Sequence, residues 1–237
     1  MLKLADVHAY YGKSHVLQGV SLDVGKGDLV ALLGRNGVGK TTTLRTIMGL
    51  LRPRSGEIRF NGQPLIGLPA HRIPRFGIGY VPQGRQIFPE LTVRENLLLA
   101  LVTDRQGGAK LQERLDSVFA SFPVLAQRVG QVAGTLSGGE QQMLAIARAM
   151  MTQPHLILMD EPTEGLMPRM VELVQETVVR LGQQGVSVLL VEQKVRGALE
   201  ICPRVYVMQK GQIVFHGTSQ ELAQDRATQV RYLGVTM

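Results

Sequence analysis

The segment that most constrains the fold is residues 34–41, GRNGVGKT, which fits the phosphate-binding pattern G-x-x-x-x-G-K-[ST]. The residues before it, 29–33, form an uninterrupted apolar run typical of a buried strand. The residues after it, 42–51, carry apolar side chains at helical spacing. A strand, a glycine-rich turn and a helix in this order predict a P-loop, and therefore an α/β chain that binds a nucleoside triphosphate.

Each residue type in this motif has a chemical task. The glycines let the backbone turn tightly and point its N–H groups at phosphate oxygens, and the helix start adds the positive end of a dipole. Lys40 brings a full charge to the β- and γ-phosphates, and the Thr41 hydroxyl can ligate Mg²⁺. We expect nucleotide contacts from the motif and the residue after it: Gly34, Asn36, Gly37, Gly39, Lys40, Thr41 and Thr42.

Composition limits the class of protein. The 237 residues are 44% hydrophobic and 19% charged, which suits one globular domain with an inserted lobe. No apolar run approaches the roughly 20 residues that span a bilayer, and the N-terminus lacks the apolar core of a signal peptide. We therefore expect a cytoplasmic protein that partners hold at a membrane. Cys202 is the single cysteine, which excludes an intrachain disulfide and a cysteine-based zinc site.

The net charge of +7 raises the question of a nucleic-acid partner. The basic residues are scattered, however, and no aromatic residues interleave with them as a base-stacking platform requires. The one loose cluster consists of Arg72, Arg75, Arg85 and Arg94. Anionic lipid headgroups explain such a surface equally well, and we expect no nucleic-acid partner.

Hydrophobic periodicity predicts an α/β core with an antiparallel layer. Alternating apolar residues indicate strands at 2–7 and 17–24, with Tyr10, Tyr11 and Gly12 in a turn. Further strands are expected at 57–60, 78–81, 156–159, 186–191, 204–208 and 212–215, with hairpin turns at 61–62 and 210–211. Helices are expected at 96–102 after a capping box that begins at Thr92, at 111–122, 138–151 and 171–181, and after Ser219.

These elements divide into two parts. Residues 87–151 are helical in character and form a predicted inserted subdomain. Residues 1–86 and 152–237 form a predicted P-loop NTPase core of the RecA-like type, with the antiparallel β layer packed on it. The whole chain is therefore expected to be a single two-lobed domain.

Two acidic residues end the predicted strand at 156–159. A P-loop protein needs a carboxylate at such a strand end to hold Mg²⁺, and Asp160 fits this role. Glu161 follows directly and can polarise an attacking water as a general base.

A second anion-binding cradle is predicted at residues 136–141, LSGGEQ, where a serine and two glycines precede a helix. Two cradles in one chain suggest two chains that sandwich ATP between them. With this motif, the P-loop and Asp160-Glu161, the sequence resembles the ATP-binding cassette (ABC) family over essentially its whole length. The resemblance implies that the signature residues contact an ATP held by the opposing subunit: Ser137, Gly138, Gly139 and Gln141.

The resemblance adds three more positions. Tyr11 matches the aromatic residue that stacks on adenine, with Tyr10 as a rival. Gln83 matches a glutamine that contacts Mg²⁺ and relays the nucleotide state to a membrane partner, beside a groove at Arg85 that receives a helix of that partner. Gln193 occupies the switch position near the γ-phosphate. The family pattern thus implies Thr41, Gln83 and Asp160 as metal ligands, and Glu161 and Gln193 as catalytic residues.

Two positions depart from the common family pattern. The switch residue is commonly a histidine, whereas Gln193 can form a hydrogen bond but carries no charge near neutral pH. The loop at 164–167, EGLM, lacks the usual terminal aspartate. Both departures suit a heterodimer whose other ATPase subunit carries the histidine. They resemble subunits of importers for branched-chain amino acids, and VPQGR at 81–85 and PTEG at 162–165 are more similar to the urea and short-chain amide subfamily.

Such an importer implies further partners: two integral membrane permease subunits and, indirectly, a periplasmic solute-binding protein. The alternatives are an exporter ATPase, such as a lipid-extraction subunit, and a soluble ABC ATPase that acts on DNA or ribosomes. The soluble class usually carries coiled-coil insertions or tandem cassettes, and this sequence has neither. The signature motif argues against a P-loop kinase.

Overall fold

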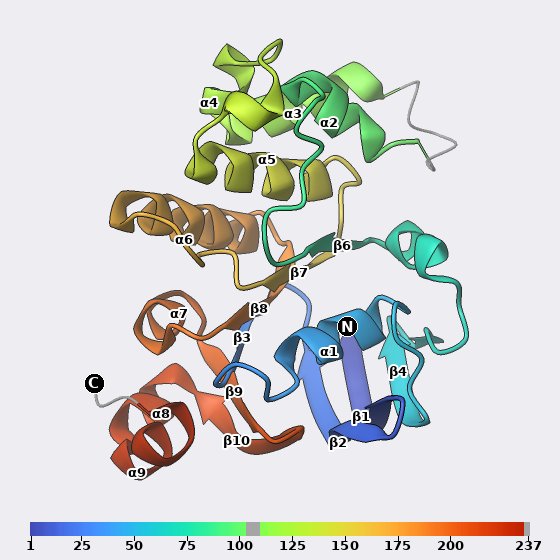
Figure 1. Ribbon diagram of the computed structural model, residues 1–237, viewed down its shortest axis with the longest axis vertical. Coiled ribbons are helices and arrows are strands. Elements are labelled where there is room, and N and C mark those ends of the chain that lie inside the picture. Colours follow the sequence, from blue (N-terminus) through green and yellow to red (C-terminus); the bar gives the residue numbers. More distant parts are fainter. Residues whose placement is uncertain (103–109, 235–237) are drawn as a thin grey trace.

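The computed structural model describes residues 1–102 and 110–234, which build two β-sheets and a group of helices (Figure 1). The first sheet has the strand order β2-β1-β4-β5 and is antiparallel. Its strands are β1 (Leu2–Tyr11), β2 (Ser14–Val24), β4 (Ser55–Phe60) and β5 (Gln63–Pro64). This sheet is the predicted antiparallel layer.

The second sheet has six strands in the order β10-β9-β3-β8-β7-β6. They are β3 (Leu29–Leu33), β6 (Ile78–Val81), β7 (Leu156–Asp160), β8 (Ser187–Glu192), β9 (Arg204–Gln209) and β10 (Gln212–Thr218). All are parallel except β10, which pairs antiparallel with β9. The carboxyl ends of the parallel strands therefore meet at one edge, where α/β proteins bind their ligands.

Alternate residues of the parallel sheet face two separate cores, because successive side chains of a strand point to opposite sides. Val30 and Leu32 pack with Leu44 of α1 (Lys40–Ile47) and with the antiparallel sheet. Ala31 and Leu33 pack in the other core, with the helices of the opposite face. Those helices are α5 (Gly138–Met150), α6 (Pro168–Gln183), α7 (Val195–Ile201) and α8 (Ser219–Gln224).

The segment predicted to be helical forms a layer at the top of Figure 1. It contains α2 (Val93–Leu99), α3 (Leu111–Ser121), α4 (Pro123–Gln127), the 3₁₀ turn η2 (Ala133–Thr135) and α5. The chain also includes the 3₁₀ helix η1 (Ala70–Phe76) and ends in α9 (Arg226–Thr228) and the π turn η3 (Gln229–Leu233). Within the described ranges, no helix is both long and apolar enough to cross a membrane.

The predicted hairpin turns and the α2 capping box are confirmed. Asn61 and Gly62 have φ values of 49° and 80°, and Lys210 and Gly211 have 45° and 78°, as a type I′ turn requires. Thr92 accepts a hydrogen bond from the backbone of Glu95, whose carboxylate accepts one from the backbone of Thr92.

Several element boundaries differ from the prediction. Tyr10 and Tyr11 belong to β1, and the turn consists of residues 12–13. Helix α1 ends at Ile47, four residues early, because Gly49 adopts a left-handed φ of 67° and the Leu50 N–H bonds to the Arg45 carbonyl. Helix α2 ends at Leu99. The predicted glycine break at 107–108 lies outside the described residues.

The later part of the chain shows three more differences. Pro123 begins α4, since proline fits the first helical turn. Helix α6 runs from Pro168 to Gln183 and so extends beyond the predicted 171–181 at both ends. Helix α7 was not predicted. The cap of α8 is Thr218, whose side chain accepts from the Glu221 backbone, while the Ser219 hydroxyl donates to the Cys202 carbonyl.

Candidate nucleotide-binding and hydrolysis site

The P-loop lies at the carboxyl end of the central strand β3 and leads into α1, as predicted. Two of its glycines are required by local geometry. A Cβ on Gly34 would lie 2.6 Å from the backbone oxygen of Met208 in β9, which is closer than contact permits. Gly39, the residue before α1, has a φ of 115° that side chains rarely adopt. The loop therefore passes close to a neighbouring strand and turns sharply into the helix.

Lys40 is buried among P-loop carbonyls and the acidic strand end. Its Nζ donates to the carbonyls of Gly34 at 2.8 Å and Arg35 at 3.1 Å. The same nitrogen lies 3.1 Å from Oε1 of Glu161, and both side chains are less than a tenth exposed. The structure thus brings together the predicted phosphate-binding cation and the predicted general base.

Thr41 and Asp160 form the predicted metal position. The Thr41 hydroxyl donates to Oδ1 of Asp160 at 3.1 Å. The second oxygen of Asp160, Oδ2, is buried and has no hydrogen-bond partner among the described residues. The pKa of Asp160 is raised to about 6, chiefly by burial. The Thr41 hydrogen bond lowers this pKa, and the negative charge of Glu161 contributes to raising it.

This arrangement fits Mg²⁺. The ion prefers oxygen ligands, and proteins usually bind it through one or two carboxylates together with substrate phosphates and waters. A hydroxyl beside a buried carboxylate with an unsatisfied oxygen supplies such a half-site, and it lies directly next to the P-loop. A cation would also favour the charged form of Asp160.

Glu161 has an unusual backbone conformation. Its φ of 47° is left-handed, which is uncommon for a residue with a long side chain. Its N–H donates to the Val191 carbonyl of β8 at 2.9 Å, and its side chain is held by Lys40. Residues in such conformations cluster at functional sites, because the surrounding structure must hold them there.

The signature segment begins α5. Ser137 is the N-cap, in a capping box with Glu140, and Gly138 and Gly139 form the first helical positions. A Cβ on Gly138 would lie 2.9 Å from Nη1 of Arg85, so the Arg85 guanidinium packs directly on the signature. The Gln141 amide points toward carbonyls of the η2 turn, at 3.4 and 3.5 Å. Figure 1 shows α5 above β6 and β7 and α1 below them, so one chain does not join its signature to its own P-loop.

The two tyrosines proposed for adenine stacking have different surroundings in the structure. Tyr10 is stacked on His15 with ring centroids 4.2 Å apart, and the Arg54 guanidinium lies 5.2 Å from its ring. Tyr11 is 43% exposed, and Arg45 of α1 lies 6.0 Å from its ring. Its exposed ring beside the P-loop helix favours Tyr11 over Tyr10 as the adenine contact.

Gln83 and Gln193 are both exposed and follow strands β6 and β8 at the same sheet edge. The Gln83 amide donates to the Glu164 carboxylate at 2.8 Å and so contacts the loop after Glu161. The strand before Gln83, β6, lies two strands away from β8, which precedes Gln193. Metal contact by Gln83 and γ-phosphate contact by Gln193 stay predictions.

Sequence reasoning missed a pair of buried polar residues beside this site. Glu192, the last residue of β8, accepts hydrogen bonds from Thr163, two residues after Glu161. The available signal was a carboxylate at the end of an otherwise apolar strand, because such a charge is rarely buried without partners.

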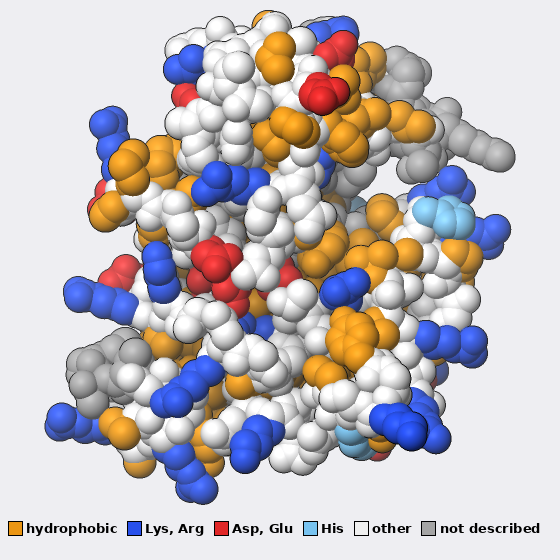
Figure 2. Space-filling model, viewed as in Figure 1, with side chains coloured by type: hydrophobic (Ala, Val, Ile, Leu, Met, Phe, Trp, Pro, Cys, Tyr) orange, Lys and Arg blue, Asp and Glu red, His pale blue; other side chains and the backbone are white. Residues whose placement is uncertain are grey.

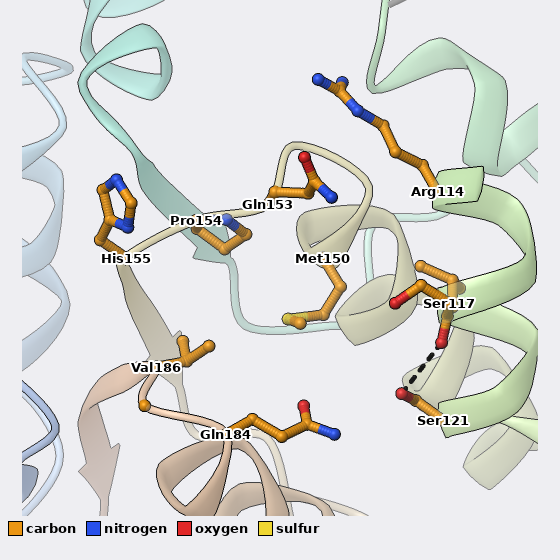
Figure 3. Close-up of a pocket in the computed structure, with 11 residues that line it drawn as sticks. Arg114, Ser117, Ser121, Met150, Gln153, Pro154, His155, Gln184 and Val186 are labelled. Atoms are coloured by element: carbon orange, nitrogen blue, oxygen red, sulfur yellow. Dashed lines mark hydrogen bonds between the residues drawn. The ribbon is translucent and has the colours of Figure 1, made fainter. Parts of the chain in front are cut away.

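A separate cavity of about 270 Å³ lies at the other edge of the parallel sheet (Figure 3). Arg114, Ser117 and Ser121 of α3 line it on one side, and His155 and Val186, which precede β7 and β8, line it on the other. Because it adjoins the amino ends of these strands, it is distinct from the site at their carboxyl ends.

Comparison with known families decides the assignment. The profile of the ABC transporter family matches residues 17–164, from β2 to the loop after Glu161. The chain belongs to this family. ABC transporter ATPase domains bind and hydrolyse ATP, and the predicted recognition, fold class and enzymatic activity are confirmed.

Three curated relatives of this ABC ATPase match it over nearly their full length. The high-affinity branched-chain amino acid transport ATP-binding protein BraG of Pseudomonas aeruginosa is 45% identical, over 99% of this chain and 100% of BraG. The probable branched-chain amino acid transport protein LivF of Archaeoglobus fulgidus is 37% identical, over 99% of both. The lipopolysaccharide export protein LptB of Escherichia coli K12 is also 37% identical, over 95% of this chain and 93% of LptB.

Solved structures agree with the family assignment. The dimeric post-hydrolysis form of the ATP-binding cassette MJ0796, bound to ADP and Pi, superposes with a TM-score of 0.82 at 28% identity. The match covers 92% of this chain and 99% of that cassette. This chain therefore shares its fold with a cassette that holds ADP and Pi.

Proposed function

We propose that this chain is the ATP-hydrolysing subunit of an importer for a small polar solute, either branched-chain amino acids or urea and short-chain amides. The observation that carries the proposal is its full-length similarity to BraG, combined with Gln193 and the loop EGLM at the two positions that depart from the common family pattern. The second candidate is an exporter, favoured by the similarity to LptB.

In the proposed mechanism, Lys40 and the P-loop amides hold the phosphates of ATP and Tyr11 stacks on adenine. Thr41 and Asp160, with Gln83, would hold Mg²⁺, and the ion would supply positive charge beside the phosphates. Glu161 orients and polarises the attacking water. Because Lys40 is paired with Glu161 at 3.1 Å, an entering phosphate competes for Lys40 and frees the carboxylate for its role as a base.

The composite site requires two subunits. The signature residues Ser137, Gly138, Gly139 and Gln141 lie on the opposite side of β6 and β7 from the chain's own P-loop, and we assign them to the γ-phosphate of the partner's ATP (Figure 1). We assign residues 87–151 as the subdomain that carries them and residues 1–86 and 152–237 as the core. The neutral Gln193 supports a heterodimer with a second ATPase subunit.

A membrane partner is proposed at the segment that joins β6 to α2, which would hold the protein at the inner face of the cell membrane. Phe88 is 49% exposed there, between Gln83 and α2, and Arg148 of α5 lies 5.3 Å from its ring while donating to the Gln86 carbonyl. Figure 2 shows hydrophobic side chains gathered between the upper helices and the body, whereas Lys and Arg are scattered over the same face. An apolar surface suits a permease helix.

The importer assignment is tested by solute uptake in cells that lack the gene. We expect uptake of either leucine or urea to fall and to return with the wild-type gene but not with Glu161→Gln. Unchanged uptake together with loss of lipopolysaccharide from the cell surface would contradict the importer and support the exporter.

Coupling is tested in the same cells with Phe88→Ala, using Arg196→Ala on the exposed surface of α7 as the control. We expect Phe88→Ala to reduce uptake at least about tenfold, the loss typical of an interface anchor, with ATP affinity unchanged. Equal loss of uptake and ATP affinity would count against a docking role.

A further inference from the structure

The buried carboxylate of Glu192 belongs to none of the phosphate or metal contacts assigned above. It is 4% exposed at the end of β8. Its Oε1 accepts a hydrogen bond from the Thr163 hydroxyl at 2.8 Å and from the Thr163 backbone N–H at 3.2 Å. One carboxylate oxygen thus collects two donors from the loop after Glu161.

The two loops joined by Glu192 carry the predicted catalytic residues. Thr163 lies two residues after Glu161 and begins the loop to α6. Gln193 is the residue after Glu192 itself. Glu161 is further tied to β8 by its N–H, which donates to the Val191 carbonyl at 2.9 Å. The left-handed backbone of Glu161 is therefore bracketed by two contacts to the end of β8.

An ordinary packing role accounts poorly for a glutamate at this position. The other buried residues of β8 are mostly Val and Leu, and a leucine at the strand end would fill similar space without a buried charge. Removing both the Glu192 carboxylate and the Thr163 hydroxyl would leave one backbone N–H without its partner. Fold stability alone therefore gives little reason for the pair.

We propose that Glu192 is a positioning residue for hydrolysis: it holds the loop after Glu161 against the switch segment of Gln193, and so fixes the Glu161 carboxylate relative to the γ-phosphate. The proposal rests on ATP hydrolysis by the ABC family and not on the identity of the solute.

The geometry predicts which replacements preserve this tether. Glutamine keeps the length of the side chain and an oxygen that accepts from both Thr163 donors. Aspartate keeps the charge but is one methylene shorter, so its oxygens withdraw from Thr163. Burial raises the pKa of Glu192, against the lowering effect of the Thr163 hydrogen bonds.

The test measures ATP hydrolysis by the complex purified with its partner subunits, with Glu161→Gln as the baseline, and ATP binding by the chain itself. We expect Glu192→Gln to stay within about twofold of wild type. Glu192→Asp should lower kcat at least about tenfold with ATP affinity unchanged, since a misplacement of about 1 Å costs up to 100-fold. Full activity of Glu192→Asp would overturn the proposal, as would parallel loss of ATP affinity.

Thr163 supplies a matched pair that guards against a folding defect. Thr163→Val has nearly the same shape without the hydroxyl donor, whereas Thr163→Ser keeps the donor. We expect Thr163→Val to lower kcat and Thr163→Ser to restore it, with circular dichroism spectra that match wild type. Equal kcat for the two variants would overturn the proposal. No transported solute enters these assays, so failure of the importer assignment would leave their outcome unchanged.

Discussion

Asp160 is a residue whose position suits metal binding better than stability. Its buried Oδ2 has no partner among the described residues, and its pKa is raised to about 6 from the ordinary 3.8, chiefly by burial. Between these two values the folded chain binds more protons at this site than the unfolded chain. Its charged form therefore destabilises the metal-free fold above pH 6, and this penalty disappears as the pH falls toward 4.

We predict that Asp160→Asn stabilises the protein when EDTA has removed metal ions. The two-unit rise in pKa sets an upper limit of about 3 kcal/mol on the gain at pH 8. The gain should shrink as the pH falls below 6. Urea unfolding at pH 8 and pH 5 measures it, with Asp116→Asn on the exposed side of α3 as the control. A variant less stable than wild type at pH 8 would show that Asp160 is adequately compensated.

Some residues of the site could be predicted from short stretches of sequence, and one could not. Lys40, Thr41, Asp160 and Glu161 were predicted because each belongs to a short motif next to a recognisable strand. Glu192 was missed because its partner, Thr163, lies 29 residues away along the chain. Only the order of the strands, which the sequence does not spell out, brings such a pair together.

At the scale of elements, helices α2 and α5 begin in the same way. Each has a hydroxyl N-cap and a glutamate three residues later that returns the hydrogen bond, with Thr92 capping α2 and Ser137 capping α5. Both helices belong to the same subdomain. Comparing substitutions of Thr92 and Ser137 therefore distinguishes the effect of losing a helix cap from the effect of losing a nucleotide contact.

We predict that Thr92→Ala and Ser137→Ala each lower the unfolding free energy by about 1 kcal/mol, the usual contribution of an N-cap. Only Ser137→Ala should reduce hydrolysis of ATP by the assembled complex, because only Ser137 is proposed to contact the partner's nucleotide. Chemical denaturation and steady-state hydrolysis are measured on the same preparations. Equal hydrolysis by the two variants would remove Ser137 from the site.

The elements that were predicted well have strong local signals. Strand β3 is a continuous apolar run, and β6 ends directly before a proline. Helix α5 has a cap and a long apolar face. Helices α4 and α7 were missed because they have five and seven residues, respectively. Helices this short are marginal by themselves and form because neighbouring elements pack against them. Those neighbours are α3 and α5 for α4, and α6, β3 and β8 for α7.

At the scale of the whole molecule, the two anion-binding segments lie in different layers. The P-loop is attached to α1, between the sheets, and the signature starts α5, in the helical layer (Figure 1). This separation supports the proposal that a complete site forms where two subunits face each other. The neutral Gln193 supports the further proposal that a different ATPase subunit supplies the switch histidine.

The most direct test of this account is ATP hydrolysis by the purified chain at several protein concentrations, repeated with a second ATPase subunit and the membrane partners. We predict feeble hydrolysis by the chain alone at every concentration, a large increase when the partners are added, and loss of most of that increase with Glu161→Gln. Robust hydrolysis by the chain alone, rising with concentration and abolished by Glu161→Gln, would establish a competent homodimer and contradict the role assigned to Gln193.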